Sequence, residues 1–208
     1  MIFSYNKAAV GDVLMVVAGN PQGQKVSSES KESITRIFVK ETGETVGWNF
    51  FKASELLPDL TGHGQIQLTL QQLIAVNIAL KVAGFSEEIM SDGEAKIVTG
   101  FVKACKAHPD SDHLSITQTE VADGEILQIV CGASNIKAGL KVVVAKPGAM
   151  MPDGMMIWPG ELRGVESLGM ICSASELAVP NAPKAKGILE LPFDTEVGVA
   201  FIGAEYVI

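Results

Sequence analysis

Cysteine is scarce in this chain of 208 residues, and no two cysteines form a C-x-x-C pair. The three, Cys105, Cys131 and Cys172, are widely spaced and odd in number. A zinc ribbon and a thioredoxin-type motif are therefore excluded, and reduced, mostly buried thiols are expected. Long hydrophobic runs are also missing, since none approaches the ~20 residues that a membrane helix needs. We expect a cytoplasmic protein that has no signal peptide and does not contact a membrane.

The chain also lacks an excess of positive charge. Its 16 Lys and Arg side chains stand against 24 Asp and Glu, which gives a net charge of −8. Residues 1–95 hold 7 basic and 11 acidic side chains, and residues 96–208 hold 9 and 13, so neither half is basic. Domains that grip nucleic acid usually carry a basic face. This composition argues against a protein that binds nucleic acid over its whole surface, but it permits a local basic patch.

No set of side chains has the pattern of a catalytic centre. His63 lies far along the chain from His108 and His113, so neither a Ser-His-Asp nor a Cys-His relay is indicated. The T-G-H-G sequence at 61–64 lacks the Gly-Lys-Ser/Thr ending of a phosphate loop. The H-P-D-S-D-H cluster at 108–113 fits ordinary turn chemistry as well as it fits a metal site. We expect no enzymatic activity, no metal and no other cofactor.

Residues 1–94 are predicted to form a small α+β domain of unknown role. Two short strands are expected within Ile2–Ala18, and a hairpin of Ile34–Lys40 and Thr45–Phe51 is joined by a glycine-containing turn. The clearest helix is Thr69–Ala83, which opens on a capping box of Thr and Gln and is followed by a glycine. The polar, glycine-containing Ser86–Ala95 segment is the best linker, and it places the domain boundary near residue 94.

Residues 95–208 show turn signals at short intervals between apolar runs. This pattern predicts a small all-β barrel of the oligonucleotide/oligosaccharide-binding type (OB-fold). Ser173 and Glu176 have capping-box spacing, which predicts a short helix that begins at Ala174. The five strands are expected at Lys96–Lys106, Leu114–Val121, Ile126–Cys131, Lys141–Lys146 and Met155–Leu162.

Four segments in this second half carry a resemblance to a known family. They are H-P-D-S-D-H-L (108–114), Q-I-V-C-G-A-S-N-I-K-A-G (128–139), V-A-K-P-G-A-M-M-P-D-G (144–154) and L-R-G-V-E-S-L-G-M-I-C-S (162–173). In this order they resemble the tRNA-binding OB domain of the endothelial monocyte-activating polypeptide group, which also occurs near the start of the bacterial phenylalanyl-tRNA synthetase β chain. The whole architecture is similar to that of the bacterial YtpR-like tRNA-binding proteins.

The resemblance implies a protein that binds tRNA without cutting or charging it, through a cationic groove that follows the phosphates. It implies a role in recognition for the S-x-G-M signature, here with Ser167 and Met170, and for Ser173 beside it. Relatives commonly carry lysines just before L-R-G, where this chain has Ile157–Glu161, so modest affinity that falls with salt is expected. The implied phosphate contacts are Lys103, Lys106, Lys137, Lys141, Lys146 and Arg163.

An alternative interpretation is a homodimeric protein-interaction or chaperone-like module with little affinity for RNA. Barrels of the family that the four segments resemble often pair as homodimers. An exposed apolar patch near Met150–Met156 or Phe201–Ile208 would indicate this function. Phe101 and Trp158 are candidates to stack on bases, although Phe101 is more typical of a barrel core.

Overall fold

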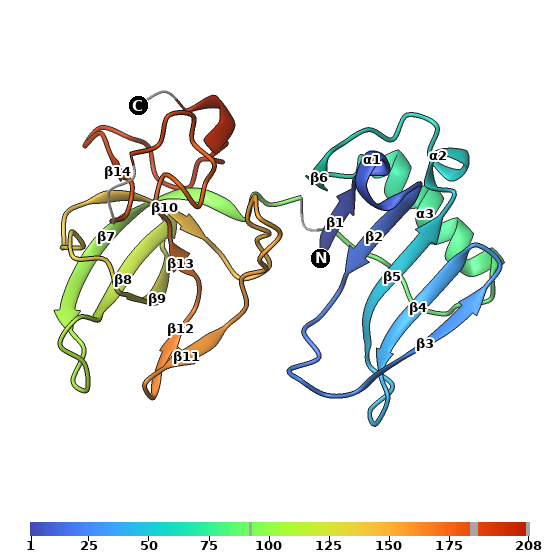
Figure 1. Cartoon of the computed structure of the whole chain (residues 1–208), viewed down its shortest axis with the longest axis horizontal. Helices are drawn as coiled ribbons and strands as arrows, with labels where there is room; N and C mark the ends of the chain where they lie inside the picture. The colour runs from blue at the N-terminus through green and yellow to red at the C-terminus, as the bar shows by residue number, and fades with distance from the viewer. Residues whose placement is uncertain (92, 184–186, 207–208) are drawn as a thin grey trace. The chain divides into compact units, whose positions relative to one another are not determined.

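The computed structural model describes residues 1–91, 93–183 and 187–206. The chain divides into two compact units, Met1–Glu94 and Ala95–Ile208, which we call unit 1 and unit 2 (Figure 1). Each unit has its own sheet and its own hydrophobic clusters. In the part of the chain that the structure describes, no helix combines the length and the apolar character needed to cross a membrane.

Unit 1 is a six-stranded antiparallel sheet with one long helix and two short ones. The hydrogen-bonded order of the strands is β3-β4-β5-β2-β1-β6. The strands are β1 (Ile2–Tyr5), β2 (Val13–Val17), β3 (Val26–Lys31), β4 (Ile34–Val39), β5 (Thr45–Phe51) and β6 (Gly64–Ile66), and the helices are α1 (Lys7–Val10), α2 (Ala53–Leu56) and α3 (Leu70–Val82).

The core of unit 1 lies between the sheet and α3. Trp48 and Phe50 of β5 are almost fully buried against Val76 and Leu80 of α3. The ring of Phe85, just beyond the helix, meets Trp48 edge-on with 4.9 Å between ring centroids. A sheet that packs one face on a helix needs these large apolar side chains, because they exclude water over the whole contact.

The predicted hairpin and the predicted helix of unit 1 are confirmed. The Thr69 hydroxyl accepts from Gln72 N, and the Gln72 amide oxygen accepts from Thr69 N, so the capping box is complete. Asn77 of α3 exchanges two hydrogen bonds of 2.8 Å with the backbone of Ile89, which fastens the chain after the helix. Strand β3, with the sequence V-S-S-E-S-K, was not expected, because its polar residues carry no strand signal.

Unit 2 is built on a sheet with the order β13-β10-β7-β8-β9, and β14 also pairs with β10. Strands β11 and β12 form a separate hairpin. The elements are β7 (Ile97–Ala107), β8 (Ser115–Ala122), β9 (Glu125–Cys131), β10 (Lys141–Ala145), β11 (Gly160–Leu162), β12 (Val165–Ser167), β13 (Met170–Ile171), β14 (Glu190–Leu191) and the 3-10 helix η1 (Gly203–Glu205).

Strand β10 is the centre of unit 2. Its run of valines is fully buried because Val142 and Val144 belong to one hydrophobic cluster, while Val143 and Ala145 belong to another. A strand that is covered on both faces reads as a continuous apolar run rather than as an alternation. The predicted strands that correspond to β7, β8, β9 and β10 are confirmed to within a residue or two.

Two predictions for unit 2 are wrong. The expected fifth strand, Met155–Leu162, contributes only β11 and one isolated bridge, and the strand beside β10 is β13 instead. The expected helix after Ser173 is a series of hydrogen-bonded turns, although its capping contacts form. Between these two segments, Gly169, at φ +135°, lets β13 lie close to β10: a Cβ on this residue would lie 2.7 Å from the Ala145 carbonyl oxygen.

Candidate nucleic-acid interface

Two of the four family-like segments meet at the turn that follows β7. His108 is 3% exposed, and its Nδ1 accepts from Asp110 N. Nε2 is therefore the protonated nitrogen, and it donates to the Leu162 carbonyl at 3.2 Å. The exposed Arg163 at the tip of the β11-β12 hairpin donates from Nη1 to the Asp110 carbonyl at 3.0 Å. The hairpin is thereby attached to the turn, and the guanidinium contacts a neutral carbonyl rather than a carboxylate.

Lys106 lies near the same end of β7, in a row that crosses three strands. It pairs with Ile116 of β8, which pairs with Val130 of β9. Residues that face each other across antiparallel strands share one side of the sheet. With a strand spacing of about 4.8 Å, Lys106 stands roughly 10 Å from Val130. Val130 lines a pocket, so the row connects an exposed lysine to the pocket wall.

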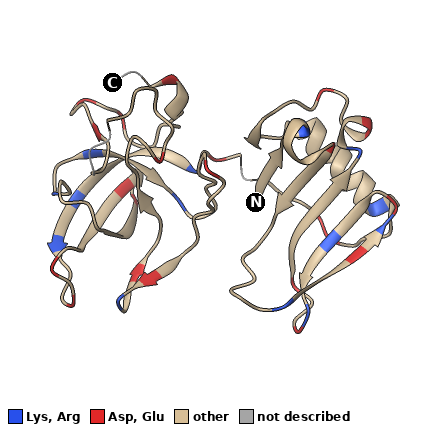
Figure 2. Cartoon of the chain, viewed as in Figure 1, with Lys and Arg blue, Asp and Glu red and all other residues tan. Residues whose placement is uncertain are grey.

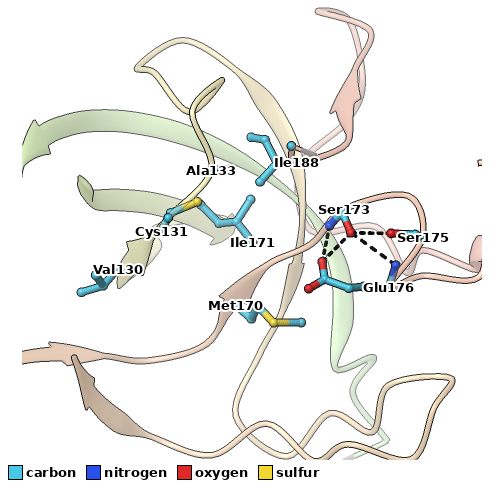
Figure 3. A pocket seen from close by; sticks show the side chains of 11 residues that line it. Val130, Cys131, Ala133, Met170, Ile171, Ser173, Ser175, Glu176 and Ile188 are labelled. Atoms are coloured by element: carbon cyan, nitrogen blue, oxygen red, sulfur yellow. Dashed lines mark hydrogen bonds between the residues drawn. The ribbon is translucent and has the colours of Figure 1, made fainter. Parts of the chain in front are cut away.

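The pocket has a volume of about 490 Å³. Figure 3 shows the sulfur of Met170 and the branched side chains of Ile171 and Ile188 around it, with the Ser173–Glu176 turn on one side. Two predicted recognition residues, Met170 and Ser173, are thus brought to one site by β13 and the turn after it. The residues that line the pocket are Val130, Cys131, Gly132, Ala133, Met170, Ile171, Ser173, Ser175, Glu176, Gly187 and Ile188.

The turn at the pocket edge is held by its own hydrogen bonds. Ser173 N and Ser173 Oγ both donate to Glu176 Oε2, at 2.7 and 2.6 Å, and Glu176 N donates to Ser173 Oγ at 3.3 Å (Figure 3). The Ser175 hydroxyl lies 3.1 Å from that of Ser173. The Ser173 hydroxyl therefore holds the carboxylate in place.

The other serine of the signature is buried. Ser167 is 4% exposed, its Oγ accepts from Val130 N at 3.1 Å, and it donates to the Gly169 carbonyl at 3.2 Å. The hydroxyl joins the corner between β12 and β13 to the end of β9. In this position its contribution is to fix the pocket wall that Val130 and Met170 form.

Three of the predicted phosphate contacts are engaged within the protein. Lys103, at the β7 bulge, pairs with Glu120 at 3.0 Å, and Lys146 is only 12% exposed and pairs with Glu125 at 2.7 Å. The Lys141 ammonium lies 5.2 Å from the centre of the Phe101 ring. Figure 2 shows how acidic and basic residues alternate over the strands of unit 2, with the basic hairpin tip between two acidic strands.

Lys137 is exposed in the loop after β9. The same loop carries Asn135, whose amide accepts from Ile188 N and donates to Ile188 O, so the loop is bound to a residue of the pocket wall. Among the residues that the structure describes, Lys106, Lys137 and Arg163 form no ion pair with an acidic side chain. These three cations remain available for an anionic partner.

Cysteine chemistry has no place at this site. Burial raises the pKa of the Cys131 thiol at the pocket wall, and it raises the pKa of the Cys172 thiol to about 12. Both side chains therefore stay protonated at neutral pH, whereas a thiolate is the reactive form. Phe101 and Trp158, the aromatic candidates, are both half-buried.

The sequence does not single out Glu176 or Asn135 as candidate site residues. From the sequence, Glu176 is only a capping partner, and Asn135 lies in a family-like segment without an assigned role. Neither carries a signal of its own, because a carboxylate in a turn and an asparagine in a loop are ordinary surface residues. Their connection to the pocket follows from contacts that only the folded chain makes.

The comparisons with known proteins agree with this division of the chain. The family described as "Putative tRNA binding domain" matches residues 97–200, and "Domain of unknown function (DUF4479)" matches residues 21–92. The chain is 44% identical over 197 residues to the Bacillus subtilis protein named "Putative tRNA-binding protein YtpR", a match that covers 95% of this chain and 97% of that protein. The chain therefore belongs to the YtpR-like family.

Unit 2 is also similar to a segment of a larger subunit. The phenylalanine–tRNA ligase beta subunit of Sulfurimonas denitrificans is 53% identical over 110 residues, and that of Oceanobacillus iheyensis is 47% identical over 116 residues. The chain spans only 14% of the length of either subunit. The crystal structure of a MetRS related protein from Pyrococcus horikoshii covers 50% of this chain and 87% of its own, at 20% identity and a TM-score of 0.37, a likeness too low to define the fold.

Proposed function

We propose that this protein is a non-catalytic tRNA-binding protein and that unit 2 is the OB-fold domain that holds the RNA. The observation that carries the proposal is the family membership: a relative named for tRNA binding matches nearly the whole chain, and a tRNA-binding family matches residues 97–200. We place its action in the cytoplasm, and we infer no cofactor. The alternative, an interaction module with little RNA affinity, is not favoured by these relatives.

The nine sequence candidates divide into three groups in this proposal. Lys106, Lys137 and Arg163 bind phosphate, because they are exposed and form no ion pair with acid in the described ranges. Lys103, Lys141 and Lys146 contribute less, since binding RNA would first require breaking an internal contact. Met170 and Ser173 shape the pocket, and Ser167 supports it.

The acidic character of the chain limits the strength of binding. A net charge of −8 repels a polyanion at long range, so contacts must be made locally by the few free cations. About three phosphate contacts on a single strand predict that log K falls against log salt with a slope of about −2. We therefore expect moderate affinity at low salt and weak binding above the physiological range.

Replacing Lys106 or Arg163 by alanine should test the interface. Each variant removes one phosphate contact, so we expect about five- to tenfold weaker tRNA binding at low salt, with a salt slope smaller by about one. The measurement is filter binding at several salt concentrations. Lys103→Ala is the matched control, because it removes the same charge from the same strand but from a lysine paired with Glu120. Equal losses in all three variants, or none, would reject this assignment.

A second copy of the chain is the proposed protein partner, through α3 of unit 1. Leu70, Ile74, Ile78 and Val82 are spaced four residues apart on the side of α3 away from the core, and each is 50–73% exposed. Helices that are apolar all round are normally covered. The spacing is symmetric about the helix centre, so an antiparallel partner would place Ile74 against Ile78. Lys81 is the only charged residue of α3, so such pairing meets little like-charge repulsion.

The other apolar surfaces expected for an interaction module are less continuous. Near Met150–Met156, Met151 is buried and Met155 is 44% exposed, and near the C-terminus Ile202 is exposed while residues 207–208 lie outside the described residues. The α3 surface is therefore the one that we propose for the homodimer.

A double substitution, Ile74→Glu with Ile78→Glu, should abolish this dimer, because it sets like charges opposite each other in a desolvated contact. Light scattering after size exclusion is expected to give twice 22.0 kDa for the parent chain and 22.0 kDa for the variant. Val26→Glu introduces a single glutamate at an exposed valine of β3, and this variant should give the same mass as the parent chain. A parent chain that is monomeric at all concentrations would refute the proposal.

A further inference from the structure

The pocket of unit 2 has a charge that does not suit phosphate. Its described lining contains no lysine or arginine and includes one carboxylate, that of Glu176. Met170, Ile171 and Ile188 supply an apolar wall instead. With a volume of about 490 Å³, the pocket falls within the range of sites that enclose small organic groups. A flat, uncharged group with polar edges fits this environment, and a nucleobase is the part of RNA that has this character.

The Glu176 carboxylate is prepared to accept further hydrogen bonds. Oε2 already accepts two, from Ser173 N and Ser173 Oγ, which uses its two lone pairs. Oε1 accepts none from the residues that the structure describes, so both of its lone pairs are free. In Figure 3 one carboxylate oxygen points to Ser173, and the other points away from it into the space beside Met170. Because the turn fixes the carboxylate, little rotamer entropy is lost when a donor binds.

We propose that this pocket binds a single unstacked base of the RNA and prefers guanine, an inference that rests on the proposed function of unit 2. Guanine carries two adjacent donors, N1–H and N2–H, on one edge, and both can reach the free Oε1. Adenine and cytosine offer one amino group beside an acceptor nitrogen. Uracil places its single N–H between two carbonyl oxygens, which the carboxylate repels. The phosphates on either side of the bound base then meet the cations outside the pocket.

The position of Lys106 agrees with a site in which the pocket binds the base and the outer cations bind the phosphates. It stands roughly 10 Å from Val130 of the pocket wall, across two strand spacings. A nucleotide whose base enters the pocket places its own phosphate several ångströms outside, towards the exposed surface. The carboxylate and the lysine therefore act on different parts of one nucleotide, and the negative charge of Glu176 is not in conflict with RNA binding.

The test compares undecamers of uridine that carry G, A, C or U at the central position. Each is labelled at the 5′ end and titrated with the full chain at low salt, with fluorescence anisotropy as the readout. A well-oriented donor pair on a carboxylate discriminates bases by about tenfold, so the G oligomer should bind about tenfold tighter than the U oligomer. The A and C oligomers should fall between them.

The variant Glu176→Gln isolates the carboxylate. Glutamine can keep the capping-box contact to Ser173, so the turn is expected to persist and thermal melts should match those of the parent. The preference for G over U should fall below about threefold. Glu166 is the exposed residue of β12 and lies outside the pocket lining, so Glu166→Gln changes the net charge equally. It should strengthen the binding of all four oligomers alike without reducing the preference.

The outcomes separate this inference from the proposed function. If tRNA binds and the four oligomers have equal affinities for the protein, the base preference is refuted while the tRNA-binding function stands. Equal effects of Glu176→Gln and Glu166→Gln on the preference would also refute it. If neither tRNA nor any oligomer binds, the proposed function itself is wrong, and the inference falls with it.

Discussion

Replacing Gly169 by alanine is expected to destabilise unit 2 by about 2 to 5 kcal/mol and to abolish RNA binding. The backbone at this residue has φ +135°, which side-chain-bearing residues rarely adopt. A Cβ here would also lie 2.7 Å from the Ala145 carbonyl oxygen of β10. Because that oxygen belongs to the most buried strand of the unit, neither side can move away cheaply, and β13 would separate from the sheet.

The effect on unit 2 alone is measured by urea unfolding monitored through Trp158 fluorescence. A Trp48→Phe background removes the other tryptophan of the chain. Gly154→Ala is the matched control. Its φ is +91°, but a Cβ there meets nothing within 4 Å, so only the backbone strain of about 1 to 2 kcal/mol is expected. If both variants lose the same stability, the close approach to β10 does not explain the glycine.

Trp48→Ala should remove about 3 to 5 kcal/mol from unit 1. This side chain is 2% exposed at the centre of the core beneath α3, and its loss leaves a cavity lined by Phe50 and Phe85. Far-UV circular dichroism in urea would report the early transition of unit 1. Trp158, the remaining tryptophan, should report an unchanged transition of unit 2, and tRNA affinity should stay within about twofold.

Phe51→Ala provides the control for that experiment. Phe51 is the last residue of β5, three positions after Trp48. It points away from the core and is 45% exposed, so its removal should cost less than about 1 kcal/mol. A shift in the Trp158 transition of Trp48→Ala would mean that the two units stabilise each other. The separate hydrophobic clusters argue for the opposite outcome.

The elements that could be predicted from sequence are those with a strong local signal. The helix capped by Thr69 and the strands around the valine run of β10 follow from periodicity, capping and burial, which short windows record. The polar strand β3 and the two-residue strand β13 do not, since pairing with neighbours defines them rather than their own residues.

The candidate site divides in the same way. The resemblance identified the segments that gather near the end of β7 and around the pocket. It could not show that, among the described residues, Lys103 is paired and Lys106 is not. That difference arises because Glu120 of the neighbouring strand β8 pairs with Lys103, and because β7 has a bulge between Val102 and Ala104. Nor could it show that Ser167 is buried, because a sequence motif does not reveal whether its serine contacts a ligand or a backbone amide.

The polar sequence of β3, which carries no strand signal, also affects how the sheet edge meets other chains. This strand is one edge of the six-stranded sheet, and an edge offers unpaired backbone groups to any other extended chain. Serines, Glu29 and Lys31 keep that edge hydrated, and Lys31 pairs with Glu29 at 3.2 Å. Strand-to-strand growth into fibrils is thereby discouraged at this border, which favours the closed association through α3 that we propose for two copies of unit 1.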